Sequence, residues 1–152
     1  RGSGSQLIGL SNGLNFVPLI CYEAIFSDFL KPSVKNADFI LQITNDAWFG
    51  RSIGPQQHLA QLRIRSIEYG LPVIRVANTG ISAIIDANGI VLKNIPVNTS
   101  GYLDAFIPSR KQSTIYGEYG NLMFLSLILM SLLFAFLYKQ IISRVRLVIE
   151  TN

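Results

Sequence analysis

Short apolar runs and stretches of helically spaced apolar positions follow one another along residues 16–107. The run FVPLIC at residues 16–21 has the length and β-branched content of a buried strand, and FILQIT at residues 39–44 predicts a second strand. Between these runs, apolar side chains recur at helical spacing over residues 25–36. A strand, a helix and a strand in this order predict a crossover unit with parallel strands.

The next stretch combines another helix with hairpins. Pro55 favours a helix start, and the pattern extends this helix to about Tyr69. The Asn88-Gly89 pair is a strong hairpin signal. Short strands are predicted at residues 73–77, 82–86, 90–95 and 102–107. This is a layered α/β pattern with about half the strands of a two-sheet, four-layer domain, so we expect an upstream half.

One segment near the C-terminus differs from all the others. Residues 122–138, LMFLSLILMSLLFAFLY, contain no charge and no polar face, and as a helix they would span roughly 25 Å of a ~30 Å hydrocarbon core. Tyr116, Tyr119 and Tyr138 flank the run at positions suited to the two headgroup levels. A transmembrane helix is therefore predicted, in preference to a buried core helix.

Composition and charge indicate a membrane-linked protein rather than a nucleic-acid binder. Of all residues 49% are hydrophobic and 14% are charged, and the net charge of +4 is spread along the chain without a dense basic patch. Lys139, Arg144 and Arg146 follow the apolar run, so the positive-inside rule predicts a cytoplasmic C-terminus with the residues before 115 on the outer side. The first residue is Arg1 rather than Met, and we expect the natural N-terminus to lie upstream.

Cys21 is the single cysteine, and it falls at the end of the first predicted strand, directly before Tyr22 and Glu23. A strand end can hold a nucleophile rigidly while leaving it reachable, and a thiolate can attack a carbonyl to form a thioester. By position alone, Cys21 is equally compatible with an inert core residue. Tyr22 offers a backbone N–H as an oxyanion donor or a packing side chain, and Glu23 offers a supporting carboxylate or a salt-bridged strand end.

Other side chains qualify for roles around such a site. Trp48 and Phe49 lie in a polar loop ended by Gly50, where exposed aromatics suit an acyl-chain entrance; the alternative is that Trp48 caps the core. His58 is the only histidine, which raises a Cys21–His58 dyad as a further alternative. Five charged residues have the spacing of a structural ion-pair network: Asp46, Arg63, Arg65, Glu68 and Arg75. No metal site and no cofactor is predicted.

Four short segments follow one another along the chain: Leu19-Ile20-Cys21-Tyr22-Glu23, Asn45-Asp46-Ala47-Trp48-Phe49-Gly50, Gln57-His58 and Asn78-Thr79-Gly80. Arg63, Arg65 and the stretch Pro72 to Arg75 lie between the last two segments. Together with the terminal apolar helix, they resemble the apolipoprotein N-acyltransferase family, membrane-bound members of the nitrilase superfamily. The resemblance covers residues 14–138. The Asn-Asp-Ala-Trp-Phe-Gly segment is its most specific part, and the terminal helix distinguishes the family from soluble nitrilases.

The resemblance implies the fold and its limits. We expect the C-terminal half of a nitrilase-like four-layer α-β-β-α sandwich followed by one transmembrane helix. Residues 1–110 would be part of the catalytic domain, residues 111–120 a linker, residues 121–142 the transmembrane helix and residues 143–152 a cytoplasmic tail. The expected location is the bacterial inner membrane, with the catalytic part on the periplasmic side.

The resemblance also implies a chemistry. Members use a Glu-Lys-Cys triad to move an acyl chain from a phospholipid onto the cysteine, and then onto the N-terminal diacylglyceryl-cysteine amine of an apolipoprotein. Cys21 matches the nucleophile, Glu23 belongs to the active-site neighbourhood, and His58 matches a structural position. The family's glutamate and lysine lie upstream of the Cys-Tyr-Glu segment, so we expect this chain alone to be inactive. Two rival hypotheses are a membrane-anchored nitrilase or amidase and a degenerate, non-catalytic membrane protein.

Overall fold

The computed structural model describes the backbone of residues 4–150 and the side chains of residues 4–142. A six-stranded sheet runs in the order of the sequence: β1 (Ile8–Gly9), β2 (Asn15–Ile20), β3 (Phe39–Asn45), β4 (Val73–Asn78), β5 (Ser82–Ile85) and β6 (Val91–Ile95). Strands β2, β3 and β4 are parallel, and the other neighbours are antiparallel. The predicted crossover unit and the predicted hairpin are both confirmed.

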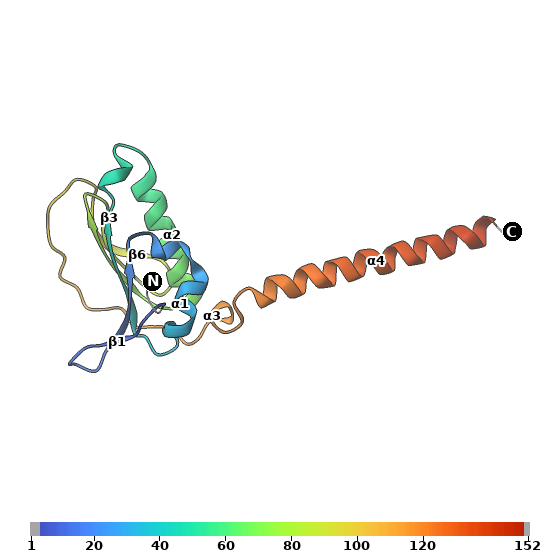
Figure 1. Cartoon of the computed structure of the whole chain (residues 1–152), viewed down its shortest axis with the longest axis horizontal. Coiled ribbons are helices and arrows are strands. Elements are labelled where there is room, and N and C mark those ends of the chain that lie inside the picture. The colour runs from blue at the N-terminus through green and yellow to red at the C-terminus, as the bar shows by residue number, and fades with distance from the viewer. Residues whose placement is uncertain (1–3, 151–152) are drawn as a thin grey trace. The chain divides into compact units, whose positions relative to one another are not determined.

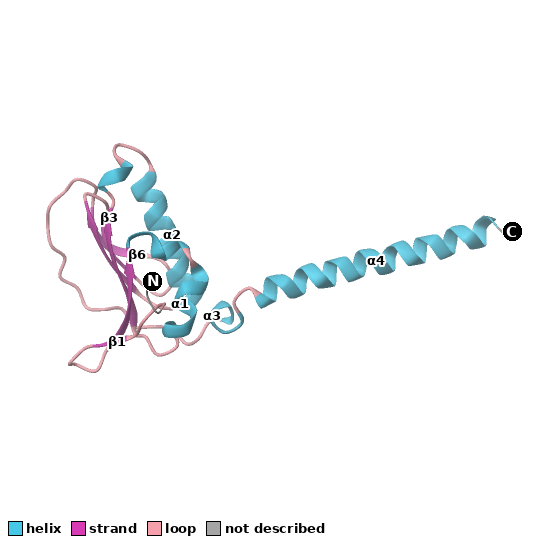
Figure 2. Ribbon diagram, in the orientation of Figure 1, coloured by secondary structure: helices cyan, strands magenta, loops and turns pink. Residues whose placement is uncertain are grey.

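Helices cover one face of this sheet (Figure 1). The 3₁₀-helix η1 (Cys21–Ile25) and α1 (Ser27–Val34) follow β2, while α2 (Gly54–Tyr69) joins β3 to β4 after the short η2 (Ala47–Phe49). Figure 2 shows α1 and α2 on the same side of the strands. α1 contains Pro32, whose missing N–H is tolerated in a helix of only eight residues.

The sheet has two unlike faces because successive side chains of a strand point to opposite sides. Val17, Ile40 and Val73 point toward the helices and are fully buried. On the other face Ile20, Ile43 and Val76 are paired across β2, β3 and β4, yet they are 55%, 50% and 52% exposed. The described chain thus forms a helix layer and one sheet, and the second face of that sheet is apolar and open.

One expectation fails between β6 and the C-terminal helix. Residues 102–107 form no strand, because no described segment pairs with them, and Tyr102 and Phe106 are exposed. Within the predicted linker, Ile115–Tyr119 form the short helix α3. The linker is therefore partly folded, although its predicted limits remain a prediction.

A second compact unit begins at Tyr119 and contains α4 (Leu122–Glu150). Its segment Leu122–Ile142 is long and apolar enough to cross a membrane, and none of it is buried within the protein. Two serines in this helix donate to carbonyls one turn earlier, Ser126 to Met123 and Ser131 to Ile128, so their hydroxyls have partners without water. The predicted cytoplasmic tail, residues 143–152, continues α4 to Glu150, and residues 151–152 lie outside the described part.

Candidate active site

Cys21 lies at the junction where β2 ends and η1 begins. Its φ of +55° is in the left-handed region, which side chains other than glycine adopt rarely and at some energetic cost. A sharp turn from strand to helix of this kind lifts a side chain out at the end of a sheet, as in the nucleophile elbows of hydrolases. Cys21 is partly exposed and forms no disulfide, so its thiol is available to a substrate.

Two hydrogen bonds hold the backbone on both sides of this turn. The side-chain amide of Gln42 donates to the carbonyl of Cys21 at 3.0 Å, and the Glu23 carboxylate accepts the N–H of Ile20 at 2.7 Å. Glu23 therefore binds back to the end of β2, an arrangement typical of a capping residue. The structure supports a role for Glu23 in shaping the turn of the nucleophile.

Gln42 belongs to a buried polar network behind Cys21. The Arg75 guanidinium donates to the Gln42 side-chain oxygen, to the Asp46 carboxylate at 2.5 Å and to the carbonyl of Ile81 at 3.0 Å. Gln42, Asp46 and Arg75 are at most 2% exposed. A buried charge pair is stable only when its remaining polar atoms are also satisfied, which this arrangement achieves. The rigid chain of contacts runs from β4 through β3 to the nucleophile.

His58 completes the network from α2. Its Nδ1 lies 3.0 Å from Asp46 Oδ1, and its Nε2 lies 3.1 Å from the Gln42 amide nitrogen. Since a carboxylate only accepts, Nδ1 carries the proton and Nε2 accepts from Gln42. Burial lowers the pKa of His58, which keeps the ring neutral. With Nε2 occupied by Gln42, His58 is not placed to take the proton of Cys21, in agreement with its expected structural role.

Thr44 links the thiol to the same network. Its hydroxyl lies 3.8 Å from Cys21 Sγ and 3.2 Å from Asp46 Oδ1. A hydroxyl has a single hydrogen to donate, so the sulfur and the carboxylate compete for it. Thr44 therefore lies between the thiol and the buried network.

Aromatic rings form the exposed side of the site. The Tyr22 ring stacks on His58 with centroids 5.1 Å apart, and it lies 5.9 Å from Trp48 and 6.2 Å from Phe49. Trp48 is 70% exposed, so it does not cap the core. The rings of Tyr22, Trp48 and Phe49 thus form one cluster, which includes the residue directly after Cys21, and a substrate-binding role for Trp48 and Phe49 stays a prediction. An oxyanion role for the Tyr22 N–H stays a prediction.

The predicted ion-pair network is only partly right. Asp46 and Arg75 do pair, but Arg65 binds Glu68 at 3.0 Å in a separate pair along α2, and Arg63 donates to the carbonyl of Gly89. They separate because Arg63, Arg65 and Glu68 lie further along α2 than His58, whereas Asp46 directly follows β3 and Arg75 lies in β4.

Sequence reasoning missed Gln42 and Thr44. The available signal was their spacing: they follow the buried Ile40 at intervals of two in an apolar strand, so they had to face the covered side of the sheet. The glycine at position 80 has a steric reason, since a Cβ at this position would overlap the Asp46 carboxylate.

The sequence of residues 2–116 matches the carbon–nitrogen hydrolase family. The chain belongs to this family. Solved structures with the same fold include an amidase from Nesterenkonia sp., which superposes with a TM-score of 0.54 at 18% identity, over 64% of this chain and 39% of the amidase. This likeness establishes the nitrilase-like fold.

More similar relatives within the carbon–nitrogen hydrolases are apolipoprotein N-acyltransferases. The protein of that name from Rickettsia bellii is 44% identical over 145 residues, which is 95% of this chain and 28% of the relative. The one from Rhizobium rhizogenes is 47% identical over 110 residues, or 72% of this chain and 21% of the relative. The chain therefore spans under a third of these proteins. The names and the apolar helix point to a membrane-associated bacterial enzyme of the N-acyltransferase type.

Proposed function

We propose that this chain carries the nucleophile of an enzyme that transfers an acyl chain from a phospholipid to the N-terminal diacylglyceryl-cysteine amine of apolipoproteins. The observation that carries this proposal is the setting of Cys21. Its backbone carbonyl accepts from the buried Gln42, and the next residue, Tyr22, belongs to a cluster of aromatic rings with Trp48 and Phe49. This combination suits a nucleophile whose substrate is largely apolar.

The reaction would proceed in two steps. The thiolate of Cys21 attacks the ester carbonyl of the phospholipid, the C–S bond forms, and the lysophospholipid leaves with a proton. The α-amine of the acceptor then attacks the thioester, the C–N bond forms, and the sulfur leaves as the thiolate while the amine loses a proton. The general base and the lysine that stabilises the tetrahedral intermediate would come from residues upstream, so this chain alone should be inactive.

A membrane location follows naturally from two lipid-borne substrates. The helix segment Leu122–Ile142 would anchor the site at a bilayer, and the basic residues after it favour a cytoplasmic C-terminus. We therefore place the enzyme in the bacterial inner membrane with Cys21 on the periplasmic side. An amidase acting on small soluble substrates would gain nothing from this helix or from the exposed Trp48.

The test is an intact-mass measurement of the complete enzyme in detergent, after incubation with phospholipid. Wild type should gain one acyl chain that hydroxylamine removes under neutral conditions, because thioesters are cleaved there. The Cys21→Ser variant should gain no hydroxylamine-labile chain. If the complete, folded wild type forms no adduct, the lipid-dependent transfer is wrong and the amidase or non-catalytic hypothesis takes its place.

A further inference from the structure

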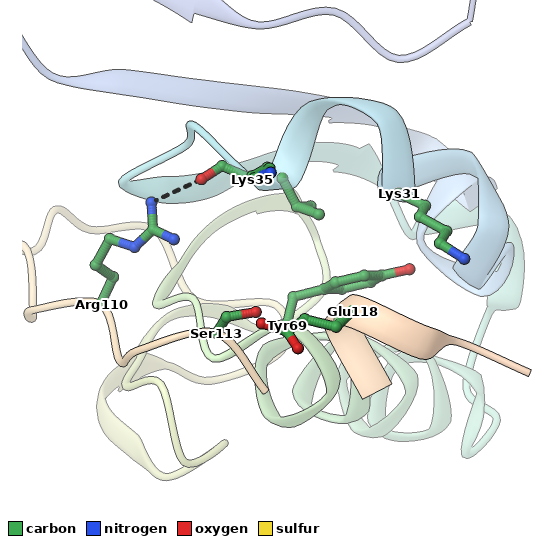
Figure 3. A pocket seen from close by; sticks show the side chains of 8 residues that line it. Lys31, Lys35, Tyr69, Arg110, Ser113 and Glu118 are labelled. Atoms are coloured by element: carbon green, nitrogen blue, oxygen red, sulfur yellow. Dashed lines mark hydrogen bonds between the residues drawn. The ribbon is translucent and has the colours of Figure 1, made fainter. Parts of the chain in front are cut away.

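A polar pocket lies at the opposite edge of the sheet from Cys21. Cys21 follows the end of β2, whereas Lys35 and Tyr69 come shortly before the starts of β3 and β4, and these three strands are parallel. The pocket has a volume of about 580 Å³, and its walls come from α1, the end of α2 and residues 110–118 (Figure 3). It is thus separate from the site described above.

Specific contacts hold these walls in place. Arg110 donates to the carbonyls of Lys35 and Ala37 at 3.2 and 2.6 Å, which ties the segment after the sheet to the end of α1. The Thr114 hydroxyl donates to the carbonyl of Glu68, and the ring of Tyr116 packs edge-on against Tyr69. The pocket is therefore a built feature of the fold, and Tyr69 forms its floor.

The lining is strongly basic. Lys31, Lys35 and Arg110 contribute three positive charges and Glu118 one negative charge, so the net charge is +2. Lys31 lies on α1 and Lys35 directly follows this helix, four residues later, where like charges repel. Among the described residues neither lysine forms an ion pair. Asp28 lies one turn before Lys31 on the same helix, without an ion pair to it. Lysines near the end of a helix can donate to its last carbonyls, but here the carbonyls of Lys35 and Ala37 already accept from Arg110. Lys31 and Lys35 therefore remain available to an anion.

The pocket lies close in sequence to the candidate membrane span. Glu118 lines the pocket, and Leu122, where the apolar helix begins, follows only four residues later. Four residues span at most about 14 Å of chain, so a bilayer around this span would make lipid headgroups the anions nearest to Glu118 along the chain.

We propose that Lys31, Lys35 and Arg110 bind the phosphate of an anionic phospholipid headgroup. The Ser113 hydroxyl, which also lines the pocket, supplies a further donor for the phosphate oxygens (Figure 3). The proposal is independent of the acyl-transfer chemistry, because it involves neither Cys21 nor the residues that support it.

The test uses the chain in non-ionic detergent and three probes: dihexanoyl phosphatidylglycerol, dihexanoyl phosphatidylcholine and inorganic phosphate, each followed by isothermal titration calorimetry. The phosphatidylglycerol should bind most tightly, and inorganic phosphate should compete with it. At about 1 kcal/mol for each lysine near a lipid surface, the double variant Lys31→Gln/Lys35→Gln should weaken its binding about 30-fold.

The matched control is Lys93→Gln, which removes the same charge from an exposed lysine on β6 and should bind as wild type does. Circular dichroism should show all variants folded. Equal binding of both lipids, or unchanged binding by the folded double variant, would overturn the proposal. Binding of inorganic phosphate without binding of phosphatidylglycerol would overturn the lipid as its source. Each result is independent of whether the complete enzyme acylates Cys21.

Discussion

Cys21 lies between two regions of opposite chemical character. Behind it, polar and charged groups are buried and paired: Gln42, Asp46, His58 and Arg75 are at most 2% exposed. In front of it, large aromatic surface is left open, and Trp48 is 70% exposed. Folding alone would favour the reverse, since burying charge is costly and exposing apolar surface forgoes stabilisation. The difference indicates that the buried side fixes the nucleophile and the open side is kept for a substrate.

The largest effect is expected from removing the central cation. Arg75→Met leaves the buried Asp46 carboxylate without its strongest partner and should lower the free energy of unfolding by about 3–5 kcal/mol. Thermal or chemical denaturation of the purified chain, followed by circular dichroism, measures this loss. Arg51→Met is the matched control, because Arg51 is exposed and should change stability by less than about 0.5 kcal/mol. Equal stabilities of the two variants would contradict the assigned role of the network.

Substitution of Glu23 tests whether its hydrogen bond at the strand end affects the catalytic rate. Glu23→Ala removes the acceptor of the Ile20 N–H and should lower kcat of the complete enzyme by roughly tenfold, the equivalent of one hydrogen bond to a charged group, with the fold retained. Glu23→Gln keeps an oxygen for this N–H and should restore most of the rate. If Gln is as impaired as Ala, the charge of Glu23 is needed and the turn is not its main role.

Substitution of Trp48 tests the role of the exposed aromatic side of the site. Trp48→Ala should raise KM for phospholipid several-fold in the complete enzyme, in line with about 1 kcal/mol for an exposed aromatic contact, while kcat and stability change little. Phe106→Ala is the control, since Phe106 is 98% exposed and belongs to the segment after the sheet. An unaltered KM would remove Trp48 from the acyl-chain entrance.

The smallest effect concerns pH. Burial holds the pKa of His58 below its ordinary 6.5, so the unfolded chain takes up a proton at higher pH than the folded one. The stability from this group is therefore complete above pH 6.5 and declines as the pH falls below it. The melting temperature, compared between about pH 7.5 and about pH 5, should drop less in His58→Gln than in wild type. That variant can still donate to Asp46 and accept from Gln42, so the complete enzyme should stay active.

The regular elements could be read from the sequence because each depends on its own pattern. Runs such as residues 16–21 and 39–44 predicted β2 and β3 within a residue at each end, and Pro55 marked the start of α2. The aromatic cluster was also predictable, since Tyr22 directly follows the strand end and Trp48 lies in the loop after the next strand.

The other features of the fold and the site depend on contacts with residues far along the chain, which local sequence patterns do not specify. Residues 102–107 look like a strand, but no described segment pairs with them, and the sequence pattern does not show that Arg75 reaches Gln42 from β4. The hydrogen bond from Gln42 to the carbonyl of Cys21, whose φ is positive, likewise joins residues far apart in the chain.

That dependence has a consequence for biosynthesis. A ribosome makes Cys21 first, then Gln42, and Arg75 only after the whole of α2. The set of contacts behind Cys21 is therefore complete only after the third of these has emerged and β4 has joined the sheet.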